Sequence, residues 1–209
     1  MTTGAGGPRG RGRPRTPGAE DKILAAALAE YGEHGWSGFT MDAVARRAGV
    51  GKSTVYLRWH DKDALLTEAV TSRGLELTTV DTGNLRDDLL ELAGNLLRHF
   101  HGPAGWASIR VTFDVASAHE KLGAFSLAVS QVHGRQVEQI CQRAKGRGEM
   151  AADVWPGVVT EAIYGAALIN ALSERLEGRE DDEAFLDQRA RWIVDLVLLD
   201  IGTERPQSK

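Results

Sequence analysis

Apolar residues recur every three or four positions along most of the chain, which is the spacing of helices that bury one face. From residue 84 onward the pattern is continuous, and its clearest run is Leu85, Leu89, Leu92, Leu96 and Phe100. No segment alternates apolar and polar residues between turn signals, so a sheet is not expected. The pattern therefore predicts an all-α chain of about nine helices.

Residues 40–66 are predicted to form two short helices joined by a glycine turn, followed by the start of another helix. Thr40 is a good N-cap residue, and Gly49 ends the first helix because glycine enters the left-handed conformation at little cost. In the second helix Val55 and Trp59 are four residues apart and share a face. This arrangement is typical of a helix-turn-helix, whose second helix enters a major groove of DNA.

A nucleotide-binding loop is a second interpretation of the same residues. Gly51-Lys52-Ser53-Thr54 resembles the end of the phosphate-binding motif G-x-x-x-x-G-K-[ST]. That motif requires a glycine five residues before Gly51, where this chain has Arg46, and it requires a buried strand in front. The preceding residues have helical spacing instead, so we reject a phosphate loop.

Residues from about 13 to 70 resemble the DNA-binding domain of the TetR (tetracycline-repressor-like) family of transcriptional regulators. The matching segments are Gly12-Arg13-Pro14-Arg15, Ile23-Leu24-Ala25-Ala26-Ala27-Leu28, Gly35 with Phe39-Thr40, Ala48-Gly49-Val50, Thr54-Val55-Tyr56, and Lys62 with Leu65-Leu66 after Asp61. The chain departs from the family in two places. The family usually has a serine near Gly51 and a glycine near Ser53, and it usually ends the recognition helix with an aromatic pair rather than Arg58-Trp59.

The chain is expected to divide into three parts. Residues 1–18 are rich in Gly, Pro and Arg and contain no acid, so they are expected to form a disordered basic arm. Residues 19–78 are the predicted helix-turn-helix DNA-binding domain, called the head below, and their first helix is predicted to end at Gly32 and Gly35. Residues 79–209 are the predicted helical ligand-binding and dimerisation domain, called the body below.

The expected DNA contacts on the head are Thr40, Lys52, Ser53, Thr54, Tyr56, Arg58 and Lys62. Lys52, Ser53 and Thr54 lie at the exposed start of the predicted recognition helix and are expected to contact bases or the groove. The resemblance implies that Thr40, Tyr56 and Lys62 contact phosphate, and their hydroxyl and ammonium groups suit that contact. Tyr56 is alternatively a core ring with its hydroxyl at the surface, and both roles can hold together.

Charge is distributed unevenly along the chain. The net charge is −4, but residues 1–67 hold ten Lys and Arg against seven Asp and Glu. DNA binding responds to such local charge. Arg11-Gly12-Arg13-Pro14 also resembles an AT-hook core, an element that enters the minor groove. Arg13 is expected to contact DNA, either by reading A·T-rich flanks or only by adding phosphate affinity.

The last two helices are predicted to be apolar over more than one face. The last carries Ile193, Val194, Leu196, Val197, Leu198 and Leu199. A helix of that kind must bury more than one face, and a second copy of the chain would cover one in a two-fold four-helix bundle. The family resemblance also implies a homodimer formed through the two C-terminal helices. The alternative is full burial within a monomer.

A small-molecule effector is expected to bind between the helices of the body. The candidate lining residues are Trp106, Arg110, Phe113, Ser117, Phe125 and Tyr164. Aromatic residues at helical spacing are more often simple core residues, and Arg110 could meet an acidic ligand or pair with a carboxylate. An effector would lower operator affinity by favouring a different spacing of two heads.

Several classes of protein are excluded by what the sequence lacks. The six histidines are scattered, no Ser-His-Asp order or nucleophile elbow is present, and one cysteine, Cys141, forms no internal disulfide. We therefore expect no enzyme, no metal and no cofactor. No N-terminal signal segment and no apolar run near ~18 residues are present, so a cytoplasmic protein without a membrane span is expected.

The expected function is a sequence-specific, homodimeric transcriptional repressor that a small molecule releases from operator DNA. The alternative is an architectural, nucleoid-type DNA-binding protein with little sequence preference. The ratio of specific to non-specific affinity at matched salt separates the two.

Overall fold

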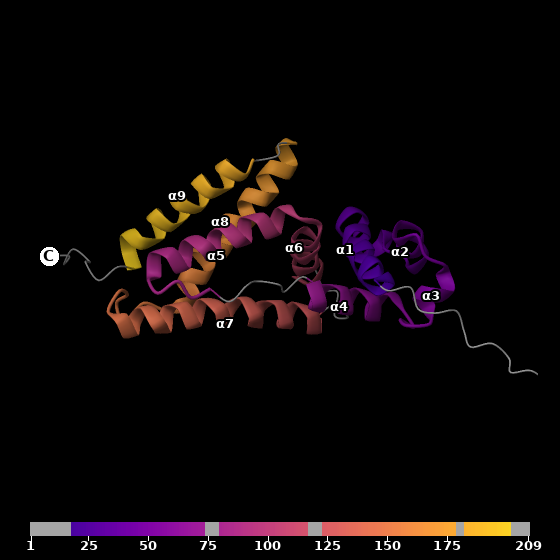
Figure 1. Ribbon diagram of the computed structural model, residues 1–209, viewed down its shortest axis with the longest axis horizontal. Helices are drawn as coiled ribbons and strands as arrows, with labels where there is room; N and C mark the ends of the chain where they lie inside the picture. The colour runs from indigo at the N-terminus through magenta and orange to yellow at the C-terminus, as the bar shows by residue number, and fades with distance from the viewer. Residues whose placement is uncertain (1–17, 74–79, 117–122, 179–181, 202–209) are drawn as a thin grey trace, which may run out of the picture.

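The computed structural model describes residues 18–73, 80–116, 123–178 and 182–201, without the side chains of 73, 115–116, 123–133 and 200. Within these ranges the chain forms nine α-helices and no strand, which confirms the all-α prediction. They are α1 (Ala19–Gly38), α2 (Met41–Ala48), α3 (Lys52–Tyr56), α4 (Lys62–Arg73), α5 (Leu85–His101), α6 (Pro103–Ala116), α7 (Gly123–Arg147), α8 (Pro156–Glu177) and α9 (Glu183–Ile201). Figure 1 shows α1–α4 at one end of an elongated molecule and α5–α9 at the other. None of the described helices is both long and apolar enough to cross a membrane.

The helix boundaries of the head follow from capping chemistry. The Thr40 hydroxyl accepts a hydrogen bond from the Ala43 amide at 3.2 Å, and Gly49, at φ 67°, ends α2. Asp61 starts α4 by accepting from the Ala64 amide at 2.8 Å. The predicted end of the first helix at Gly32 is wrong, because Gly32 is helical and α1 breaks at Gly35, at φ 63° and ψ −173°.

The buried apolar residues of the described chain form two hydrophobic cores, and α6 contributes side chains to both. The core of the head is built from α1–α4 together with Ala107 and Val111 of α6. Ile109 of the same helix belongs to the core of the body. The predicted boundary between head and body, at residues 78 and 79, lies outside the described residues, and within them α6 connects the two cores.

Cys141 is fully buried in the core of the body. Burial raises the pKa of its thiol to about 11, so the reactive thiolate is scarce at neutral pH. The side chain therefore packs as a small apolar residue.

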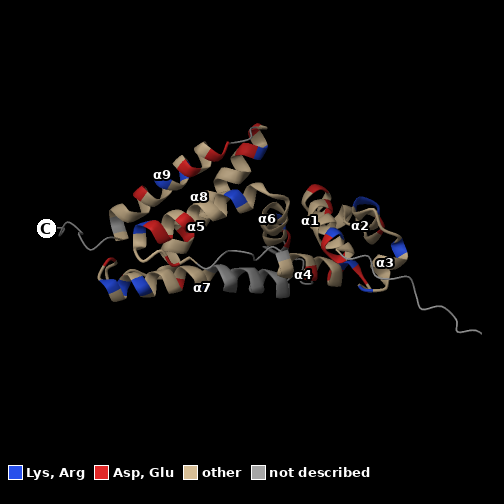
Figure 2. Cartoon of the chain, in the orientation of Figure 1, with Lys and Arg blue, Asp and Glu red and all other residues tan. Residues whose placement is uncertain are grey.

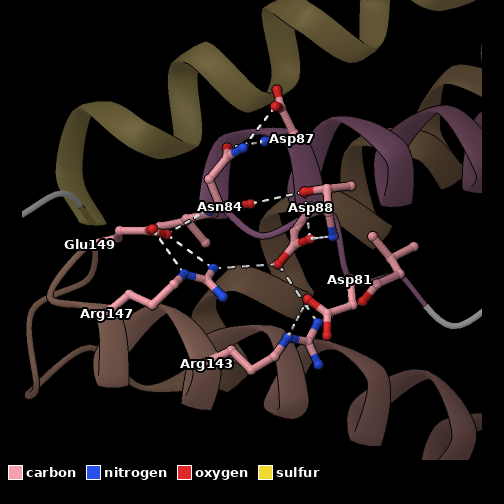
Figure 3. Close-up of polar contacts among 10 residues, drawn as sticks. Asp81, Asn84, Asp87, Asp88, Arg143, Arg147 and Glu149 are labelled. Carbon is pink, nitrogen blue, oxygen red and sulfur yellow. Dashed lines mark hydrogen bonds and ion pairs between the residues drawn. The ribbon is translucent and has the colours of Figure 1, made fainter.

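A buried carboxylate fastens the start of α5 to the end of α7 (Figure 3). Asp88 is fully buried, and its Oδ1 accepts from the amide and the hydroxyl of Thr82 at 2.6 and 2.8 Å. Its Oδ2 lies 3.6 Å from the guanidinium groups of both Arg143 and Arg147. Glu149 accepts from the Leu85 amide at 2.6 Å and completes this cluster of charges.

Replacing Asp88 by alanine is expected to lower the free energy of unfolding by about 2 to 3 kcal/mol, because two arginines lose their buried counter-charge. Urea denaturation followed by circular dichroism measures the change. The matched control is Asp87→Ala, one residue earlier, where the exposed carboxylate accepts from Asn84 at 2.8 Å. That control should cost less than about 1 kcal/mol. Equal losses of unfolding free energy in the two variants would show that the buried cluster contributes no more stability than an exposed hydrogen bond.

Candidate nucleic-acid interface

The recognition helix α3 is anchored by two side chains. Its helical turn continues past Tyr56, since Leu57 and Trp59 donate backbone hydrogen bonds to Ser53 and Val55, both at 3.0 Å. Val55 and Trp59 are buried in the core of the head, which confirms that they share one face. The opposite face of the helix is consequently open to solvent.

The predicted groove residues lie on accessible surface. Lys52, Ser53 and Thr54 are all exposed, and Tyr56 is 51% exposed. Leu57, which was not among the predicted contacts, is 87% exposed. The exposure of Leu57 could have been predicted from the sequence, because the residue lies two positions from each of the buried anchors Val55 and Trp59.

Two basic side chains, one at the start of the recognition helix and one just after its end, are paired with carboxylates of the head. Lys52 forms an ion pair with Asp42 of α2. Arg58 pairs with Glu20, lies 3.4 Å from Glu68 and stacks over the Trp59 ring. All of the charged groups are exposed, so the pairs are weak and DNA phosphate can compete for the cations.

Two other predicted phosphate contacts also hold the head together. Thr40 uses its hydroxyl oxygen as the cap of α2, which leaves the hydroxyl proton available. The Lys62 ammonium donates to the Trp36 carbonyl at 2.9 Å and lies 4.1 Å from the centre of the Trp36 ring. The remaining candidate, Arg13, lies outside the described residues.

The described part of the head is close to neutral, so the positive excess of residues 1–67 does not lie on the helix-turn-helix itself. Residues 18–73 hold seven Lys and Arg and eight Asp and Glu, and Figure 2 shows both signs interleaved over α1–α4. Arg47, for example, binds the buried Glu30 at 2.7 Å and also binds Glu33, and its hydrogen bond lowers the pKa of the Glu33 carboxyl. The positive excess of the N-terminal third comes from the four arginines of residues 1–17.

Two candidate effector-binding residues hold α6 against α1. The Trp106 indole donates to the Gly32 carbonyl at 3.0 Å, and Arg110 Nη1 donates to the same oxygen at 3.0 Å. A Cβ at Gly35 would lie 2.6 Å from the Arg110 guanidinium, so a side chain there would displace it. Arg175 of α8 stacks over the Trp106 ring at 4.2 Å and ties this junction to the body.

The remaining effector candidates are Phe113, Ser117, Phe125 and Tyr164. Phe113 is half exposed on α6, and Tyr164 packs against the core of the body, where burial raises the pKa of its hydroxyl. Ser117 and the side chain of Phe125 lie outside the described residues. The effector site therefore stays a prediction.

A head built from a helix-turn-helix with an open recognition face, joined to a separate helical body, defines a DNA-binding regulator. Residues 23–69 match the model of the bacterial regulatory proteins of the tetR family, and residues 79–193 match the tetracyclin repressor-like C-terminal domain. The chain therefore belongs to the TetR family of transcriptional regulators, which are not enzymes.

Individual relatives agree with this family. The uncharacterized HTH-type transcriptional regulator YdeS of Bacillus subtilis is 28% identical over 178 residues, which cover 84% of this chain and 88% of the relative. The HTH-type transcriptional regulator AqdR of Rhodococcus erythropolis is 30% identical over 146 residues, covering 69% and 70%. The solved structure of the regulator FadR from Bacillus subtilis in complex with stearoyl-CoA has the same fold, with a TM-score of 0.71 at 15% identity, covering 87% and 98%.

Proposed function

We propose that the protein is a homodimeric repressor that a small molecule releases from its operator. The observation that carries this proposal is an exposed apolar face on the last two helices, at a distance from the recognition helix. A dimer joined there presents two recognition helices to the two half-sites of a near-palindromic operator.

The apolar face, called the α8–α9 face below, consists of exposed side chains at helical spacing. They are Val158, Ile169 and Leu176 on α8 and Trp192, Leu196 and Leu199 on α9. Intervals of 4, 7 and 11 residues return to nearly the same side of a helix, so each set forms one stripe. Exposed apolar surfaces on helices are typical of protein interfaces.

The body and α6 support an effector-controlled switch. The body of the FadR neighbour shares this fold, and that protein was solved with a bound ligand. In the present chain α6 contributes to both cores and is hydrogen-bonded to the backbone of α1. A ligand that favours a different position of α6 would therefore move the head and lower operator affinity.

The decisive experiment is selection of bound DNA from a random pool with the full-length protein, followed by release with candidate small molecules. We expect a near-palindromic consensus whose affinity exceeds that of unrelated DNA by at least about 10³-fold at matched salt. At least one compound should release the protein. Binding without a preferred site would instead support the architectural alternative, and a consensus with no releasing compound would remove the effector from the proposal.

A further inference from the structure

Leu57 is the most exposed of the large apolar side chains that the structure describes, at 87%. Leu57 lies two residues after Val55 and two before Trp59, about 200° around the helix from each. Those two residues are buried, so Leu57 points directly away from the core of the head.

The neighbours of Leu57 place it within the DNA-reading surface. Ser53 lies four residues before it and Thr54 three, so both border Leu57 on the same side of the helix. Both are exposed. By contrast, Lys52 lies about 140° from Leu57 around the helix and its ammonium is paired with Asp42 on α2. The side of the helix opposite the core is thus formed by two small hydroxyl residues and one leucine.

Chemistry limits what a leucine can recognise in this position. Its side chain has no hydrogen-bond donor or acceptor, so it gains only by covering an apolar group. On the base edges of the major groove the apolar group is the C5-methyl of thymine. We propose that Leu57 packs on one thymine methyl in each half-site and makes that base pair a specificity determinant. The proposal rests on the proposed operator binding. It specifies in addition that Leu57 is the residue that reads the base pair and that the thymine methyl is the group it contacts.

The test replaces thymine by uracil, one position at a time, in the operator obtained by selection. Uracil keeps the base pair and removes only the methyl. At one thymine position in each half-site, replacing that thymine in a single half-site should lower the affinity of the wild-type protein about fourfold, because one methyl-sized group is no longer buried. Replacing it in both half-sites should lower the affinity about fifteenfold, because two such groups are lost. Fluorescence anisotropy at constant salt measures these ratios.

Three variants assign the effect. Leu57→Ala should bind the thymine and uracil operators with nearly equal affinity, whereas Leu57→Met should keep the preference. Thr54→Ser removes the methyl group of the neighbouring threonine and should also keep it. Because Leu57 is so exposed, its substitution should leave the melting temperature unchanged, which scanning calorimetry checks.

Two results would overturn the proposal. One is a wild-type protein that binds its selected operator and is indifferent to every thymine-to-uracil change. The other is a uracil effect that persists in Leu57→Ala or disappears in Thr54→Ser. Failure to select any operator is a different outcome, because it contradicts the proposed function before the role of Leu57 is examined.

Discussion

Replacing Leu196 by glutamate is expected to convert the proposed homodimer into monomers. Leu196 is 71% exposed and lies in the middle of the α9 stripe, between Trp192 and Leu199. In a two-fold interface the same patch is used by both subunits, so each dimer would have to bury two new carboxylates. Burying an ionised carboxylate without a partner costs several kcal/mol, which is a large fraction of the stability of a dimer.

Sedimentation velocity at micromolar concentration measures the change directly. The matched control is Leu57→Glu, which places the same charge at a similarly exposed leucine outside the α8–α9 face and should leave the dimer intact. Operator affinity of Leu196→Glu should fall by about 10²- to 10⁴-fold, because a single head binds without the help of a linked second head. A Leu196→Glu protein that stays dimeric would exclude the α8–α9 face as the interface, and a monomer with undiminished affinity would exclude the need for a dimer.

The local features of the head could be predicted from the sequence because they depend on neighbours in the chain. The cap at Thr40 joins residues three apart, and the anchors Val55 and Trp59 are four apart. Gly49 adopts the left-handed conformation that its place after the apolar pattern indicated. Spacing of this kind fixes which side of a helix is buried, and the same spacing puts Leu57 opposite the core.

Contacts between distant residues were not predictable in the same way. Trp106 and Arg110 have the aromatic and cationic character of pocket residues, and periodicity alone assigned them to the body. Their partner Gly32 is 74 residues away from Trp106 in the chain, and helical spacing carries no information about such pairs. The partner of Arg58, Glu20, is 38 residues away in the chain. Helical spacing therefore could not predict that this cation of the head is paired with a carboxylate.

The charge of the arm leads to the second large effect. Since residues 18–73 are close to neutral and Lys52 and Arg58 are already paired, the general attraction to phosphate should depend on Arg9, Arg11, Arg13 and Arg15. We expect that changing these four arginines to glutamine lowers operator affinity at ~150 mM salt by at least about 100-fold. The slope of log affinity against log salt should become shallower by about 0.9 for each phosphate that the arm no longer neutralises.

A single substitution then separates the two roles considered for Arg13. Arg13→Lys keeps the charge and should retain the salt slope on either interpretation. If Arg13 reads a narrow minor groove, this variant loses the preference for A·T-rich flanks in the selected operators, because arginine suits that groove. If it only adds phosphate affinity, the flank preference is the same in both proteins. An unchanged salt slope in the four-glutamine variant would mean instead that Lys52 and Arg58 leave their carboxylate partners and bind the phosphates themselves.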